Sequence, residues 1–155
     1  MNFTDSLNRK MEEVKRPPNL PTGHYVWQIN KVPEQESFES SRTGTTFDRL
    51  TFQVSCVEAM DDVDPDDLAE YGNVAGTLNR KSFLFTQDPD EKAGFERSMF
   101  QLKRFLEHCG VEEDVTLEEG INNAVGNQFV GEVTHRPDPN DTEIIYAEIG
   151  RTAAV

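Results

Sequence analysis

The stretch TLNRKSFLFTQDPDEKAGFERSMFQLKRFLEHCG, residues 77–110, joins a strand pattern directly to the clearest helix pattern in the chain. Its first ten residues, 77–86, are rich in β-forming side chains. Apolar side chains then recur at helical spacing, with Leu102 and Leu106 among them. Gly110 stands where a glycine commonly ends a helix. The stretch therefore predicts a strand followed at once by an amphipathic helix.

Two further strand patterns precede this stretch and two follow it. In residues 47–59 apolar and polar side chains alternate, so one face of that strand is expected to fill the core. A polar run at 34–44, EQESFESSRTG, is expected to form a long loop. The four strand patterns lie at residues 24–32, 47–59, 127–136 and 142–150.

The order of these elements predicts the fold. Five strands with the main helix between the third and the fourth is the order of an OB-fold barrel. We therefore expect a mainly β, α+β protein: a five-stranded antiparallel OB-fold-like barrel with a short N-terminal helix. Another small antiparallel barrel or an α+β sandwich is the competing interpretation. Residues 1–20 are expected to form the N-terminal helix and a Pro-rich linker, and residues 21–151 the OB-fold domain.

The N-terminal residues 4–15 read as an amphipathic helix that ends before Pro17. A helix this short is marginal alone, so it must dock on another surface. That surface is either its own domain or another subunit, and homo-oligomerisation stays open. The apolar side chains that recur at helical spacing are Phe3, Leu7, Met11 and Val14.

Bulk composition limits the class of protein. The chain has 155 residues and a net charge of −14, which argues for solubility and weakly against non-specific nucleic-acid binding. It has neither a long apolar run nor the apolar core of a signal peptide, so no membrane association and a cytoplasmic location are expected. Cys56 and Cys109 are expected to be reduced and buried.

The acidic segment 58–70 invites a calcium interpretation, but the spacing fails the loop template at its glycine and at its last glutamate. Asp64 as the N-cap of a short helix that begins at Pro65 explains the segment more simply. No metal-ligand spacing, nucleophile motif or phosphate-binding glycine loop is present elsewhere. We therefore expect no enzyme activity, no metal and no cofactor.

The expected ligand address of an OB-fold lies across strands two and three, between the loops that join strands one to two and four to five. In this chain those places hold cations and aromatic rings, while the acids gather elsewhere. Cations can follow a phosphate backbone, and rings can stack on unpaired bases at roughly 1–3 kcal/mol per base. This pattern favours a single-stranded DNA-binding surface. The candidate nucleic-acid-binding residues are Trp27, Phe38, Arg42, Phe47, Arg49, Arg80, Lys81, Phe83, Arg136 and Tyr146.

Strand parity leaves several of these roles open. Arg80 and Lys81 point to opposite sides of one strand, so only one of them can face a groove unless a bulge intervenes. Phe83 and Phe85 share a side and are either core or stacking surface. The side of the strand that holds Trp27 is likewise either core or surface.

Six segments together resemble a family of phage-encoded single-stranded DNA-binding proteins, formerly described as a domain of unknown function. They are PTGHYVWQINKV, SRTGTTFDRLTFQV, RKSFLF, FQLKRFLEHCGV, GNQFVGEVTHR and IIYAEIG, spread over about residues 20–150. The resemblance implies an OB-fold, sequence-tolerant binding of single-stranded DNA, and a role in phage DNA replication or recombination in the host cytoplasm. Bacterial single-strand binding proteins end in an acidic tail, whereas this chain ends GRTAAV. The internal acidic segment 58–70 is the alternative contact for replication or recombination proteins.

A different class of function competes with DNA binding. The acidic bulk and the amphipathic N-terminal segment also suit a non-enzymatic OB-fold that serves as a protein-interaction or structural module.

Overall fold

The longest strand, β3 (Thr46–Ala59), organises the sheet, because three other strands pair with it. The computed structural model describes residues 2–155. It is mainly β, with six strands in one open antiparallel sheet and a few helices, which is consistent with the predicted α+β class. The other strands are β1 (Gly23–Ile29), β2 (Glu34–Glu39), β4 (Leu78–Thr86), β5 (Gln128–Pro137) and β6 (Ile145–Ala153).

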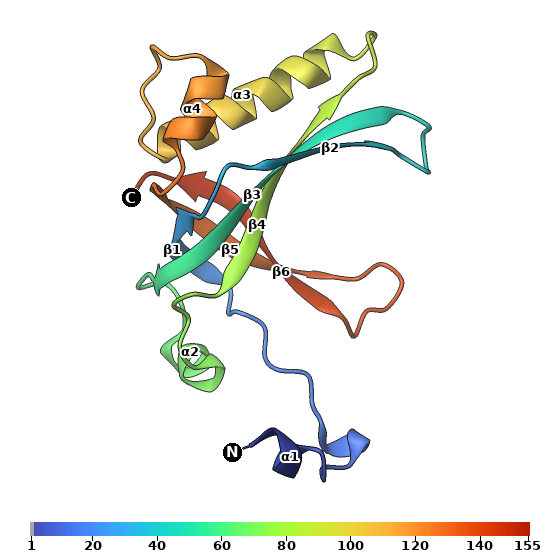
Figure 1. The fold of residues 1–155 in the computed structure, drawn as a ribbon, viewed down its shortest axis with the longest axis vertical. Helices are drawn as coiled ribbons and strands as arrows, with labels where there is room; N and C mark the ends of the chain where they lie inside the picture. Colours follow the sequence, from blue (N-terminus) through green and yellow to red (C-terminus); the bar gives the residue numbers. More distant parts are fainter. Residues whose placement is uncertain (1) are drawn as a thin grey trace.

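The helices lie at the two ends of the sheet (Figure 1). The predicted helix after the third strand pattern is present as α3 (Lys92–His108), which lies with α4 (Leu117–Asn123) at one end. The other end carries α2 (Pro65–Tyr71), α1 (Phe3–Ser6) and the 3-10 turn Met11–Glu13. Within residues 2–155, no helix combines the length and the apolar composition needed to cross a membrane.

The two edges of β3 hold different partners. Along one edge β2 pairs with the first part of β3, from Glu39↔Thr46 to Glu34↔Thr51, and β1 pairs with the last part. β4 pairs along the other edge. β1 continues the sheet to β5, and β5 pairs with β6. The sheet therefore branches at β3, with β4 at one end and β6 at the other.

The expectation of a closed, five-stranded barrel is wrong in two respects. Residues 34–39, predicted as loop, form an additional strand, β2, which pairs with β3. The sequence shows no strand pattern there, because the polar side chains of β2 face solvent on a hairpin that extends past the core. In the part of the chain that the structure describes, no backbone ladder joins β4 to β6. Two side chains link them instead: Asn79 Nδ2 donates to Ala147 O at 3.1 Å, and Lys81 Nζ donates to Gly150 O at 3.0 Å.

The core lies between α3 and the inner face of the sheet. The alternation predicted for 47–59 is confirmed, since every second residue from Leu50 to Cys56 is buried. Phe105 of α3 is at the centre, with its ring centroid 5.1 Å from that of Phe52 and 4.9 Å from that of Phe129. This packing covers one face of β3 and leaves the other free.

The predicted helix over residues 4–15 is not formed as one unit. Only the single turn α1 and the 3-10 turn appear, and both stand apart from the sheet (Figure 1). Of the two surfaces considered for docking, its own domain is not contacted, because the apolar side chains of this segment are exposed. An undocked helix of this length is unstable, which explains why the pattern does not propagate. The exposed apolar residues are Phe3, Leu7, Met11 and Val14.

Candidate functional site

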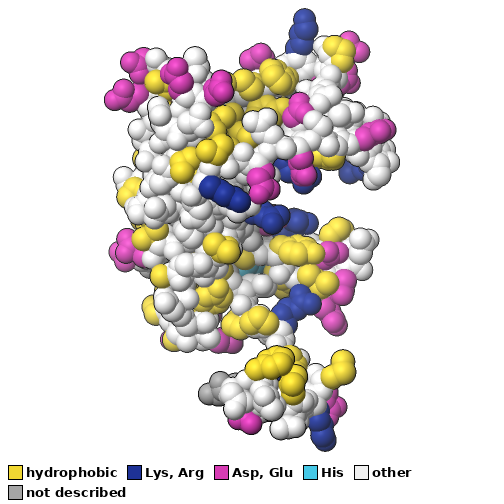
Figure 2. Space-filling view, in the orientation of Figure 1, with side chains coloured by type: hydrophobic (Ala, Val, Ile, Leu, Met, Phe, Trp, Pro, Cys, Tyr) yellow, Lys and Arg dark blue, Asp and Glu magenta, His cyan; other side chains and the backbone are white. Residues whose placement is uncertain are grey.

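Two hairpin arms extend from the sheet toward the same side (Figure 1). Side chains of both arms line a groove. The β2–β3 arm comprises residues 34–51, and the β5–β6 arm comprises residues 134–148. The groove has a volume of about 720 Å³ and is lined by side chains of β2, β3, β4, β5 and β6. Lys and Arg side chains gather in this hollow in the space-filling view (Figure 2). We call it the central groove.

The β2–β3 arm carries a stacked aromatic pair with an arginine above it. Phe38 and Phe47 are cross-strand partners, with ring centroids 5.8 Å apart and planes inclined by 24°. The guanidinium carbon of Arg49 lies 4.4 Å from the centroid of Phe38. Arg49 Nη1 also donates to Glu36 Oε1 at 2.8 Å. Cation, ring and carboxylate thus form one half-exposed cluster.

The β5–β6 arm repeats this arrangement with other residues. Arg136 and Tyr146 are cross-strand partners, and the guanidinium carbon lies 5.2 Å from the ring centroid. Arg136 Nε donates to Glu148 Oε1 at 2.7 Å. The Tyr146 hydroxyl donates to Asp138 Oδ2 at 2.7 Å, and this hydrogen bond raises the pKa of Tyr146 and lowers that of Asp138. The ring is therefore held in place at its outer end.

Strand β4 resolves the choice between Arg80 and Lys81. Arg80 is exposed and lines the central groove, and within residues 2–155 its guanidinium makes no ion pair. Lys81 points to the other side, where its Nζ reaches Gly150 O and lies 5.5 Å from the centroid of Phe83. Burial lowers the pKa of Lys81. Of these two residues, Arg80 is therefore the one that lines the central groove.

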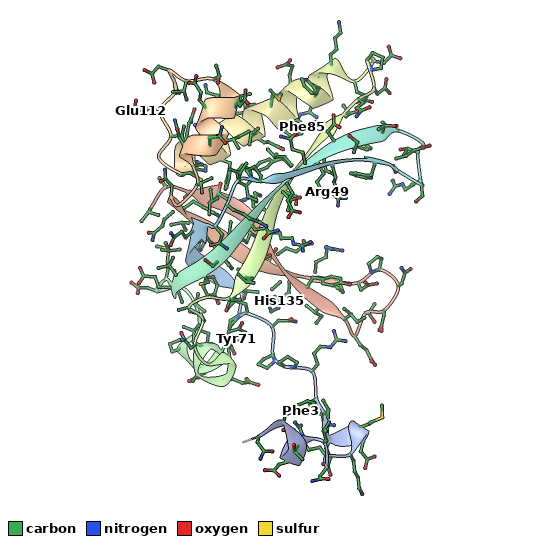
Figure 3. The ribbon with its side chains drawn as sticks, viewed as in Figure 1. Phe3, Arg49, Tyr71, Phe85, Glu112 and His135 are labelled. Carbon is green, nitrogen blue, oxygen red and sulfur yellow. The ribbon has the colours of Figure 1, made fainter. Side chains whose placement is uncertain are left out.

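The floor of the central groove is polar. Thr51 Oγ1 and Ser82 Oγ share a hydrogen bond of 3.1 Å, and Leu84 adds an exposed apolar side chain. Figure 3 places Arg49 toward the hollow, whereas Phe85 faces α3. Three arginines and three glutamates line the groove, and two of those arginines are already paired. The empty groove is thus close to electrically neutral.

Besides Lys81, three candidate residues lie outside this surface. Trp27 is 0% exposed, and its Nε1 donates to Gly131 O at 3.3 Å inside the core. Phe83 is 7% exposed and packs on Phe105. The expectation that these two rings stack on bases is wrong, because both are packed in the core. Arg42 is exposed in the turn at the end of the β2–β3 arm and does not line the central groove.

Of the remaining candidates, Arg49, Arg80 and Arg136 line the central groove. The aromatic candidates are not lining residues but lie beside it on the two arms, next to Arg49 and Arg136, namely Phe38, Phe47 and Tyr146. Sequence reasoning missed the glutamates that pair with Arg49 and Arg136. Glu36 and Glu148 lie opposite or next to the arginines only in the final register, and no local pattern shows that register.

Comparison of the sequence with models of protein families and with curated proteins gives no match. The functional argument therefore depends on the fold and on the geometry of the central groove.

Proposed function

We propose that the protein binds single-stranded DNA in the central groove, without strong sequence preference. One observation carries the proposal: each of the two arms presents an aromatic ring with an arginine above it, and the unpaired Arg80 lies on the strand between them. Aromatic rings and cations along a groove are what sequence-tolerant single-strand binding requires.

The connection of the strands supports the proposal. With β2 counted as an extension of the first hairpin, five strands remain, and they lie side by side in the order β4-β3-β1-β5-β6. In the chain, α3 follows β4 and precedes β5, which are the third and fourth of these five strands. We interpret this arrangement as an OB-fold whose barrel is open between β4 and β6. The β2–β3 arm and the β5–β6 arm then correspond to the two loops that frame the ligand in that fold.

Binding would proceed by exchange of partners. Arg80 contacts a phosphate directly, while Arg49 and Arg136 leave their glutamates for phosphate oxygens. These ion pairs are exposed, so breaking each one costs only about 0–1 kcal/mol. Bases stack on the Phe38–Phe47 pair and on Tyr146, each contributing roughly 1–3 kcal/mol.

Fluorescence anisotropy of a labelled oligothymidine tests this function. We expect binding at low salt that weakens as salt rises, and much weaker binding to a duplex of the same length. Arg80→Gln should weaken binding to all single-stranded sequences alike. Equal affinity for duplex and single strand would contradict the stacking of bases on the aromatic rings. No binding at low salt would contradict the proposed function as a whole.

The resemblance to phage proteins extends the proposal to DNA replication or recombination, with partner proteins at the acidic segment 58–70. Asp64 caps α2 as predicted, its carboxylate accepting from Asp66 N at 2.8 Å. The exposed acids Asp66, Asp67 and Glu70 remain available on the surface of α2. Their replacement by Asn and Gln should abolish capture of a phage replication protein and preserve DNA binding; unchanged capture would exclude this segment.

A protein-interaction module is the second candidate function. It is favoured by the N-terminal segment, where Phe3 is 77% and Met11 is 93% exposed. Such side chains seldom gather on a free surface without a partner. Sedimentation velocity of the full chain and of a Leu7→Asp/Met11→Asp variant tests whether this segment mediates self-assembly: a lower mass of the variant supports it, and equal masses contradict it.

A further inference from the structure

A second hollow lies beneath α3, on the opposite side of β4 from the central groove. It has a volume of about 500 Å³ and is lined by residues of α3, β4 and β6. Its charged and titratable side chains are Lys81, Arg104, His108 and Arg151, and none of its lining residues, all within residues 2–155, is acidic. In a chain of net charge −14, such a pocket is unusual. We call it the helix pocket.

The polar groups of the helix pocket retain donors for a ligand. Lys81 Nζ uses one of its three N–H groups on Gly150 O, at 3.0 Å. Arg104 Nη1 lies 3.4 Å from Glu107 Oε2, in a loose pair whose arginine is 56% exposed. Arg151 is exposed, and among the described residues it makes no ion pair. Several N–H donors of the lining therefore remain available to an anion.

The helix pocket also contains an exposed ring. Phe100 of α3 is 58% exposed, unlike Phe83 and Phe105 in the same lining. His108 Nδ1 is bonded to Thr152 Oγ1 at 2.8 Å, which fixes the imidazole beside the cations. A cationic hollow with one free aromatic face fits a nucleotide unit, whose phosphate needs donors and whose base needs a stacking surface.

The helix pocket adjoins the central groove at β4. Ser82 of β4 lines both of them. Within residues 2–155 no backbone ladder joins β4 to β6, and the side chains of Asn79 and Lys81 bridge the two strands. A DNA strand that passes over this edge therefore crosses two side-chain hydrogen bonds but displaces no β-strand. Arg80 and Lys81, adjacent in sequence, then offer one cation to each side of this crossing.

We propose that the helix pocket is a second phosphate-binding site, which holds a nucleotide of the DNA strand after that strand leaves the central groove over the edge of β4. This inference rests on the proposed single-strand binding and names the path of the strand. Arg104 and Arg151 bind the phosphate, Lys81 supports it from below, and Phe100 stacks on the base.

Two oligothymidines of different length test the path. One of about five nucleotides fills only the central groove, and one of about sixteen also reaches the helix pocket. The double variant Arg104→Gln/Arg151→Gln should lose roughly 3- to 10-fold in affinity for the long strand. Its salt slope should decrease by about 0.7, the value for the one phosphate held in the helix pocket, with no change for the short strand. Lys81 is left intact because it links β4 to β6.

A matched control is Lys92→Gln/Lys103→Gln, which removes the same charge from α3 at positions outside the helix pocket. If the test variant and this control have the same affinity for the long strand, the path is wrong. In that case a loss of affinity in Arg80→Gln shows that the proposed function still stands. If the wild-type protein binds neither strand, both proposals fail.

The source of the phosphate is tested separately by the amide resonances of Gly150, Arg151 and Thr152. We expect the long strand to shift them strongly, and inorganic phosphate at an equal concentration of phosphate groups to shift them little. Equal shifts would make the helix pocket a site for a free phosphate compound, and the inference about the strand would be overturned.

Discussion

Removal of the two glutamates that pair with groove arginines should tighten single-strand binding. In the free protein Arg49 lies 2.8 Å from Glu36, and Arg136 lies 2.7 Å from Glu148. Exposed pairs of this kind contribute only about 0–1 kcal/mol to stability. Glu36→Gln and Glu148→Gln should therefore leave the fold intact while changing what the arginines do.

The expected gain in DNA-binding free energy has two parts. A carboxylate about 7 Å from a bound phosphate opposes it by roughly 0.6 kcal/mol at the dielectric constant of water, less after screening by salt. Release of the arginine from its pair adds up to about 1 kcal/mol. Each substitution should then tighten binding by about 0.5–1 kcal/mol, or roughly 2- to 5-fold, and the double variant by roughly 5- to 25-fold.

The assay is anisotropy of a labelled oligothymidine at about 50 mM and about 200 mM salt. The matched control is Glu112→Gln/Glu118→Gln, which changes the net charge equally at exposed acids outside the central groove. The control should stay within about 2-fold of the wild type, because those charges are distant and screened. Affinity of the Glu36→Gln/Glu148→Gln variant equal to or below that of the control would refute the exchange of partners. Loss of folding cannot imitate the expected tightening, since it would weaken binding.

Three further predictions concern the core. Because Trp27 is fully buried, its emission should not change when oligothymidine is added; strong quenching would show that the ring is accessible. Gly131→Ala places a methyl carbon 2.8 Å from Ile149 Cγ2 and 3.0 Å from Trp27 Cδ1, so the free energy of unfolding in urea should fall by about 1–3 kcal/mol; an unchanged midpoint would contradict this packing. Burial raises the pKa of Cys56 to about 11 and that of Cys109 to about 12. The unfolded chain loses these protons at lower pH than the folded protein does, so the free energy of unfolding should fall as pH rises from about 9 through 11. A Cys56→Ala/Cys109→Ala variant should show a smaller fall, the remainder coming from Tyr25, whose pKa burial also raises.

Much of the scaffold could be predicted because its signals are local. The alternation in β3 and the helical stripe of α3 reflect a single buried face on each element. Parity within β4 likewise separates Arg80 from Phe83 without any knowledge of tertiary structure. What parity cannot say is which side is inside, and the packing of Phe83 against Phe105 decides that.

The features that sequence reasoning missed depend on contacts between distant residues. β2 has no apolar alternation, and it is a strand only because Phe38 and Glu36 find partners on β3. The N-terminal pattern predicts a helix, yet in this structure its apolar residues do not dock, so only short turns form. The ion pairs of the groove glutamates could not be predicted for the same reason, since the pairing of Glu148 with Arg136 depends on the register of two strands.

The most direct measurement is the dependence of oligothymidine affinity on salt concentration for the wild-type protein and for Arg80→Gln. If single-stranded DNA lies in the central groove, the logarithm of affinity falls linearly with the logarithm of salt concentration, by about 0.7 for each phosphate contacted. The Arg80→Gln variant should bind more weakly, with a slope smaller by about 0.7. No binding by the wild-type protein at low salt, or an identical slope in the two proteins, would contradict the assignment of the central groove as the DNA-binding surface.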